Sequence, residues 1–158
     1  MCIRDSLIYS AGYLIRKRIL EMSSVEWDQI YNTNLRGVFF VLKHIEKVLK
    51  LQGKCIFIGS SSYSLGRQYY AAYSSSKAAL INLIQAAAAE MSYYYINVIS
   101  PQRADTGMRI QNFPSKKDLT SLLKPEDIAE DVLKILSLNV SGMNFDIRID
   151  VPLTGFTT

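Results

Sequence analysis

The sequence has few of the residues on which metal centres and disulfide scaffolds depend. It contains one histidine and two cysteines, Cys2 and Cys55, with no Cys-x-x-Cys pair and no cluster of cysteine with histidine. A zinc site needs several such ligands, so we expect no protein metal site. Cys55 lies in an apolar run typical of a strand, where a buried reduced thiol is the usual state. The low cysteine count therefore argues against a disulfide framework.

Long apolar runs and concentrated charge are also missing. No apolar stretch reaches the length of a membrane span, and the N-terminus lacks the basic and then apolar layout of a signal peptide. The formal net charge is +4, and the basic residues are spread along the chain instead of forming a run. We therefore expect a cytoplasmic protein without membrane or nucleic-acid partners, and with a modest affinity for anionic substrates.

What is present indicates one globular domain. The 158 residues are 49% hydrophobic and 20% charged, which is typical of a chain that buries a core. Apolar runs predict strands, and apolar residues at helical spacing predict helices. The expected strands lie at residues 7–12, 54–59, 95–99 and 142–149, and the expected helices at residues 23–49, 72–91 and 125–137.

The helix boundaries have local signals of their own. Ser23 and Glu26 have the spacing of a capping box, and Pro125 opens the last helix with acidic residues in its first turn. We expect residues 102–124 to form a loop with short helical pieces. The alternation of strands and helices predicts an α/β fold with a doubly wound parallel sheet, which binds ligands at the carboxyl ends of its strands.

A tyrosine and a lysine stand four residues apart after a serine cluster. If Tyr73 and Lys77 lie on one helix, they share a face one turn apart. An ammonium group beside a phenol favours the phenolate, so Tyr73 could donate or accept a proton nearer neutral pH. A surface pair on a helix is the alternative, because a sequence with ten tyrosines produces this spacing readily by chance.

Five motifs in order connect this pair to a known family. They are Tyr9-Ser10-Ala11-Gly12 after the first strand, Asn34 in the first long helix, Ser60 after the next strand, Tyr73 with Lys77, and Pro101 with Thr106. With these motifs, residues 7–148 resemble the C-terminal two thirds of a short-chain dehydrogenase/reductase. Two asparagines of the first motif are replaced here, and Gln102 stands where the family usually has glycine.

The resemblance implies a division of roles. Ser60 would donate a hydrogen bond to a substrate carbonyl, and Tyr73 would exchange a proton with that oxygen. Lys77 would adjust the pKa of Tyr73 and bind the nicotinamide ribose, while Asn34 would hold a water that links the lysine to solvent. The residues expected to contact a bound NADP or NAD are Ala11, Gly12, Tyr73, Lys77, Pro101 and Thr106.

Each single residue also has a structural alternative. Ser60 could be a turn residue at the strand end, with Ser61 or Ser62 equally able to take its role. Asn34 could satisfy a helix kink, and Thr106 could cap a helix. Sequence alone leaves these alternatives open.

The glycine-rich turn that binds the pyrophosphate in this family is not found. Gly12 is the first glycine of the chain, so we expect a Rossmann-like sheet truncated at the N-terminus, without its first strands or the residue that selects NADP or NAD. Residues 1–6 resemble a translated sequencing adapter. We therefore expect a non-native leader at 1–6, a partial reductase domain at 7–158, and little activity or solubility for the chain alone.

A narrower resemblance concerns the substrate. The serine cluster and the segments 101–109 and 112–113 are similar to the reductase domain that makes CDP-ribitol precursors from ribulose 5-phosphate. Three guanidinium groups near the expected site suit a phosphate, namely those of Arg67, Arg103 and Arg109. That they are ordinary surface arginines is an equal alternative. The resemblance also implies a homodimer or homotetramer of the full-length protein, and the alternatives are a non-catalytic regulatory member or an inactive fragment.

Overall fold

The chain folds around a four-stranded parallel sheet. The computed structural model describes residues 4–113, 115 and 121–149. The strands pair in chain order, β1-β2-β3-β4, with every neighbouring pair parallel. Their bounds are β1 (Arg4–Tyr9), β2 (Leu49–Ile58), β3 (Tyr95–Pro101) and β4 (Asn144–Ile147).

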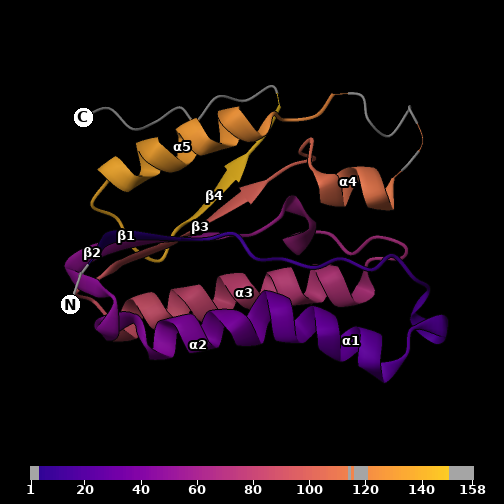
Figure 1. Cartoon of the computed structure of the whole chain (residues 1–158), viewed down its shortest axis with the longest axis horizontal. Helices are drawn as coiled ribbons and strands as arrows, with labels where there is room; N and C mark the ends of the chain where they lie inside the picture. The colour runs from indigo at the N-terminus through magenta and orange to yellow at the C-terminus, as the bar shows by residue number, and fades with distance from the viewer. Residues whose placement is uncertain (1–3, 114, 116–120, 150–158) are drawn as a thin grey trace.

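Helices cover both faces of the sheet. Helices α1, α2 and α3 lie against one face and α5 against the other, while α4 lies beyond the carboxyl ends of the strands (Figure 1). This is the layered arrangement that the alternating pattern predicts. The helices are α1 (Ser24–Tyr31), α2 (Gly37–Lys43), α3 (Ala71–Glu90), α4 (Gly107–Asn112) and α5 (Pro125–Ser137).

The predicted helix starts are confirmed. The Ser23 hydroxyl accepts a hydrogen bond from the Glu26 amide at 3.2 Å, and the Glu26 carboxylate accepts one from the Ser23 amide at 2.8 Å. This capping box satisfies donors that the first helical turn leaves unpaired. Pro125 occupies the first turn of α5, as expected of a residue that lacks an amide hydrogen.

Two apolar clusters, one on each face, hold the layers together. Because side chains alternate along a strand, Phe57 points to α3 and Ile56 to α5. Phe57 packs with Leu80 and Ile84, while Ile56 packs with Ile135. Each of these side chains is almost fully buried, and burial of such a group contributes about 1.5–3 kcal/mol. The sheet is therefore fixed from both sides.

The helix expected at residues 23–49 is wrong in its interior and its end. Five residues, Asn32–Arg36, form a π-helical turn between α1 and α2, and α2 ends at Lys43. Leu49 already belongs to β2, which continues through Gln52 at a positive φ of 62°. Ile45 and Leu49 are buried, but a short turn and a strand bury them instead of one helix. The spacing of apolar residues alone did not distinguish one continuous helix from a helix followed by a turn and a strand.

Strand β1 is an edge strand of the described sheet. It begins at Arg4, so Arg4 and Ser6 of the expected leader pair with β2. Residues 1–3 lie outside the described residues. Ile8 is 52% exposed and Leu133 of α5 is 66% exposed, which leaves apolar surface on the α5 side of the sheet.

In the part of the chain that the structure describes, no helix is long and apolar enough to cross a membrane.

Candidate active site

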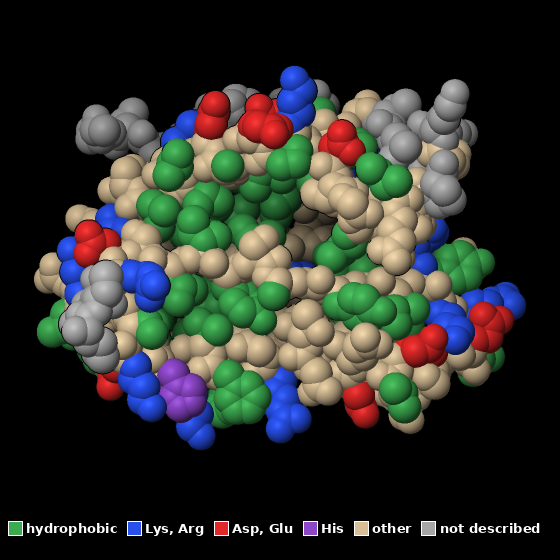
Figure 2. Space-filling view, viewed as in Figure 1, with side chains coloured by type: hydrophobic (Ala, Val, Ile, Leu, Met, Phe, Trp, Pro, Cys, Tyr) green, Lys and Arg blue, Asp and Glu red, His purple; other side chains and the backbone are tan. Residues whose placement is uncertain are grey.

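A cleft of about 670 Å³ lies at the carboxyl ends of the strands. It is lined from the ends of β1, β2 and β3, from the start of α3, and from α4 and α5. Figure 2 shows the hollow on this face of the molecule, bordered by apolar side chains. A crevice in this position is where doubly wound sheets bind their ligands.

Tyr73 and Lys77 line the floor of the cleft from the first turns of α3. They lie one turn apart, and Tyr73 is 9% exposed while Lys77 is 3% exposed. The Lys77 ammonium donates a hydrogen bond to the Ile58 carbonyl at 2.7 Å and lies 5.9 Å from the centre of the Tyr73 ring. The predicted pair is therefore a buried one, and the surface alternative does not hold.

Burial controls how both groups titrate. It lowers the pKa of Lys77 to about 8, because a buried ammonium loses its hydration. Burial also raises the pKa of Tyr73, although its hydrogen bond with Ser60 acts in the opposite direction. The phenol therefore keeps its proton at neutral pH in this structure, whereas the sequence suggested that the lysine would favour the phenolate.

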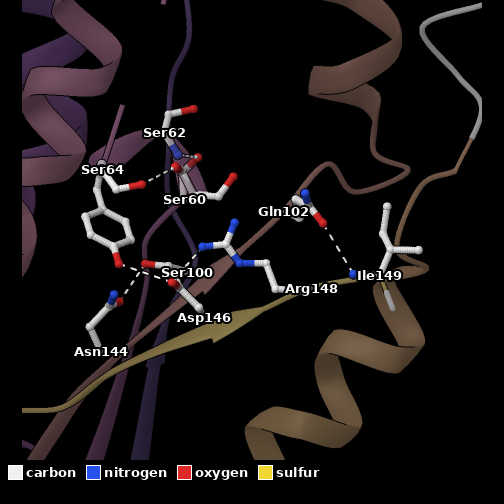
Figure 3. A network of polar contacts seen from close by, with 11 residues as sticks. Ser60, Ser62, Ser64, Ser100, Gln102, Asn144, Asp146, Arg148 and Ile149 are labelled. Atoms are coloured by element: carbon white, nitrogen blue, oxygen red, sulfur yellow. Dashed lines mark hydrogen bonds and ion pairs between the residues drawn. The ribbon is translucent and has the colours of Figure 1, made fainter. Parts of the chain in front are cut away.

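Ser60 lies at the end of β2 and has two partners. Its hydroxyl forms a hydrogen bond with Tyr73. It also accepts a hydrogen bond from the Ser62 amide at 3.2 Å (Figure 3). It is thus both the turn residue of the structural alternative and a partner of the tyrosine. Ser61 and Ser62 are buried and also line the cleft.

The glycine before Ser60 permits a close contact with β3. A methyl group at Gly59 would lie 2.5 Å from the Ser100 hydroxyl and 2.8 Å from Val98, both on β3. Only glycine allows the two strands to approach so closely at this point. Gly59 and Ser60, the first residue of the serine cluster, both line the cleft.

Asn34 lies in the π-helical turn, behind the cleft. Its amide group donates to the Tyr13 carbonyl and to the Ser76 hydroxyl, each at 3.0 Å, and its oxygen accepts from the Tyr13 amide at 2.7 Å. Both amide hydrogens are thus used within the protein. Asn34 fastens the loop after β1 to α3, and its side chain has no donor left for a bridging water.

Most of the residues expected to hold the cofactor line the cleft. Gly12, Pro101 and Thr106 do so together with Tyr73 and Lys77, whereas Ala11 is exposed and is not among the lining residues. A methyl group at Gly12 would enter the space between Lys77 and Asn34, at 3.7 and 3.8 Å from their polar atoms. Thr106 caps α4, because its hydroxyl accepts a hydrogen bond from the Arg109 amide at 3.2 Å. An open floor beside a buried ammonium fits the ribose and nicotinamide of a dinucleotide.

The three arginines expected to contact substrate all border the cleft. Arg67 and Arg103 have exposed side chains, and Arg109 is half-buried. The Arg109 guanidinium lies 3.7 Å from the centre of the Phe113 ring. This wall of the cleft is thus positively charged, and the described residues that line the cleft include no Asp or Glu.

A polar network beside the cleft joins the serine loop to β4. Figure 3 shows Asp146 of β4 between the Arg148 guanidinium and the serine loop. Asp146 accepts hydrogen bonds from Arg148 at 2.8 Å and from the Tyr63 hydroxyl at 3.2 Å. Gln102, which replaces the glycine usual in the family, accepts a hydrogen bond from the Ile149 amide at 3.3 Å. Its side chain is therefore fastened to the end of the sheet.

Sequence reasoning missed the aromatic part of the site. Leu14, Tyr73 and Phe113 form a separate apolar cluster with Tyr70 and Met108 packed against it. Arg16 contacts this cluster through Phe113. The sequence shows three neighbouring basic residues from Arg16 to Arg18, and Phe113 within the segment of the narrower resemblance, but nothing to indicate that Arg16 and Phe113 meet.

Comparisons with known proteins agree with this geometry. The model of the family described as enoyl-(acyl carrier protein) reductase matches residues 4–147. A 2,3-dihydro-2,3-dihydroxybenzoate dehydrogenase from Bacillus subtilis is 29% identical over 84% of this chain and 59% of its own length. A bifunctional ribulose 5-phosphate reductase/CDP-ribitol pyrophosphorylase from Haemophilus influenzae is 33% identical over 90% of this chain and 31% of its own length.

Solved structures give the same result. A short chain dehydrogenase from Escherichia coli CFT073, solved in complex with NADPH, matches with a TM-score of 0.83 and 27% identity over 92% of this chain and 63% of that one. The chain thus spans less than two thirds of the length of each of these relatives. Its sheet order, its Tyr73 and Lys77 pair and the match over residues 4–147 lead to one conclusion. The chain belongs to the short-chain dehydrogenase/reductase family.

Proposed function

We propose that the protein is an NADP- or NAD-dependent oxidoreductase that interconverts a carbonyl compound and an alcohol. The observation that carries the proposal is the Tyr73 side chain at the floor of the cleft, whose hydroxyl is hydrogen-bonded to Ser60 and whose ring centre lies 5.9 Å from the buried Lys77 ammonium. A phenol and a hydroxyl that converge on one open space can both reach a single substrate oxygen. A role as a non-catalytic regulatory member gains no support from this arrangement.

The protein's own residues supply the proton and the charge stabilisation. In reduction, Tyr73 donates its proton to the substrate oxygen, and Ser60 donates a hydrogen bond to the same oxygen as negative charge develops. The raised pKa of Tyr73 means that the phenol still carries at neutral pH the proton that it donates. The bound nicotinamide supplies the hydride.

Lys77 and Asn34 act from behind these two groups. The Lys77 ammonium is held by the Ile58 carbonyl, so it can stabilise the phenolate that forms when Tyr73 loses its proton. Asn34 positions the loop that carries Gly12 through its hydrogen bonds to Tyr13. We propose that it shapes the floor in this way, in addition to the water-holding role that the family resemblance implies.

The identity of the dinucleotide is left as NADP or NAD. The solved relative with NADPH favours a nicotinamide cofactor of this kind at the cleft. Gly12, Lys77 and Thr106 line the cleft and would hold its ribose and nicotinamide, whereas Ala11 is exposed and does not line the cleft.

We further propose a phosphorylated sugar, such as ribulose 5-phosphate, as the substrate. The Haemophilus influenzae relative is named for that reaction, and three guanidinium groups border the cleft. Arginine suits a phosphate because its planar group donates two parallel hydrogen bonds. The guanidinium groups are those of Arg67, Arg103 and Arg109.

Two exposed apolar surfaces bear on the activity and the assembly of the protein. Ile8 on the edge strand and Leu133 on α5 leave apolar surface that a longer protein would cover, so we expect the chain alone to be inactive. Val25, Phe39 and Phe40 are exposed on α1 and α2 and would suit a homodimer or homotetramer in the cytoplasm.

The proposal is tested with the full natural protein that carries this chain. Purified protein is mixed with NADPH or NADH and with ribulose 5-phosphate, ribulose or a simple ketone, and oxidation of the cofactor is followed by absorbance. We expect turnover of ribulose 5-phosphate that depends on Tyr73. Turnover of the ketone alone would reject the sugar phosphate, and no turnover with any carbonyl compound would reject the reductase.

A further inference from the structure

Phe113 is held between two guanidinium groups at the mouth of the cleft. The Arg16 guanidinium carbon lies 4.0 Å from the centre of its ring and that of Arg109 lies 3.7 Å from it. At such distances each group lies over a face of the ring, and two groups cannot share one face. Arg16 and Arg109 therefore stack on opposite faces of Phe113, which is itself buried.

Arg16 also fastens the backbone beside that ring. Its Nη1 donates a hydrogen bond to the Asn112 carbonyl at 2.8 Å, across 96 residues of sequence. The neighbouring Lys17 amide donates to the Tyr69 carbonyl at 3.1 Å, so the loop after β1 is tied to the loop before α3 as well. Arg16 thus connects three segments that are distant in the sequence.

The segment that Arg16 holds is a wall of the cleft. Phe113 packs against Tyr70 with ring centres 6.1 Å apart, and Tyr70 packs edge-on against Tyr73 at 5.9 Å. Arg109 and Phe113 both line the cleft, whereas Arg16 is exposed and does not. Through Phe113, the stack therefore connects Arg16, which lies outside the cleft, with Arg109, which lines it.

We propose that Arg16 is a positioning residue for recognition of an anionic substrate. By occupying one face of Phe113 and bonding to Asn112, it fixes residues 107–113 so that the Arg109 guanidinium is directed to the cleft. A phosphate bound by Arg109 relieves the repulsion between the two like charges across the ring, so binding of the anion tightens the stack. The substrate part of this inference rests on the proposed function, but the positioning part does not.

The first test measures hydrogen exchange in the full natural protein and in two variants. Arg16→Met keeps a long side chain on Phe113 and loses the charge and the hydrogen bond, while Arg16→Lys keeps the charge and loses the planar group. We expect the backbone amides of residues 106–113 to exchange about tenfold faster in Arg16→Met, with Arg16→Lys in between. Inorganic phosphate should slow their exchange in the unmodified protein but not in Arg16→Met.

Arg18→Met is the matched control. Arg18 lies in the same loop, is exposed and pairs with Glu21 at 3.9 Å, and has no contact with Phe113 among those described. Its exchange at residues 106–113 should equal that of the unmodified protein. Unchanged exchange in Arg16→Met, or equal acceleration in Arg18→Met, would overturn the positioning role.

The second test separates recognition from folding. With ribulose 5-phosphate, Arg16→Met should raise KM about tenfold and leave kcat within about twofold, while KM for uncharged ribulose stays the same. An equal rise of both KM values would reduce Arg16 to a structural residue and overturn the proposal. Absence of turnover in the unmodified protein would reject the proposed function, and the exchange and phosphate results would still decide the role of Arg16.

Discussion

The floor of the cleft and its charged wall are built in different ways. On the floor, Tyr73 and Lys77 are buried in α3 and bonded to Ser60 and the Ile58 carbonyl. On the wall, Arg67 and Arg103 project from loops and are exposed. Buried groups with fixed partners have perturbed pKa values and fixed geometry, which proton transfer needs. Exposed arginines suit recognition, because they can adjust to a ligand. The difference predicts that chemistry and substrate choice can be altered separately.

The largest effect should come from the floor. Tyr73→Phe removes the proton donor and should lower kcat about 10²–10⁴-fold for every carbonyl substrate, with KM little changed. Steady-state kinetics of the full natural protein measure this. Tyr69→Phe, in the exposed loop before α3, is the control and should keep its rate. A Tyr73→Phe variant with undiminished kcat would remove the tyrosine from the chemistry.

The support behind the floor should be costly to remove. Asn34→Leu leaves the amide and carbonyl of Tyr13 without their partner in a buried site, and each unpaired group costs about 1–3 kcal/mol. Urea unfolding should show that loss of stability. Thr33→Val, one residue away on an exposed part of the turn, should cost less. An equal loss of unfolding free energy in the two variants would mean that the hydrogen bonds of Asn34 do not stabilise the loop after β1 more than an ordinary contact does.

The titration of Lys77 gives a test that needs no substrate. Its pKa is about 8 in the folded protein against an ordinary 10.5, so the unfolded chain holds more protons between these values. Stability due to Lys77 therefore rises with pH in that window, by at most ~1.4 kcal/mol per pH unit. Relative to Lys77→Met, the unmodified protein should gain stability from pH 8 to 10 in urea unfolding. Parallel curves for the two proteins would contradict the burial of a titrating lysine.

The smallest effect should come from the wall. Arg103→Ala should raise KM for ribulose 5-phosphate about tenfold, or ~1.4 kcal/mol, and spare a neutral ketone. Arg36→Ala, an exposed arginine on the turn before α2, serves as the control. Kinetics with both substrates decide the matter, since an equal change for the ketone and the sugar phosphate would discard the phosphate role.

The sequence predicted the sheet and the floor better than the wall. Strand patterns and the spacing of Ser60, Tyr73 and Lys77 are local, so order along the chain was enough to place them at the end of β2 and on α3. The end of α2 was misplaced because Ile45 and Leu49 are buried at a spacing that also fits a helix. Local patterns carry little information about contacts between distant segments.

The contact of Arg16 with Phe113 illustrates this limit. It joins segments about a hundred residues apart, and Arg16 stands in none of the motifs. The pKa of Tyr73 was also misjudged in direction, because the burial of the phenol is a property of the fold and not of its neighbour four residues away. Both features depend on packing that appears only when the layers assemble.

The separation of chemistry and recognition is tested most directly by kcat/KM for ribulose 5-phosphate in Tyr73→Phe, Arg103→Ala and the double variant of the full natural protein. If floor and wall act independently, the two losses multiply, and the coupling stays below about 0.5 kcal/mol. A double variant no worse than Tyr73→Phe alone would show that the floor and the wall act as one unit, and would contradict the separation.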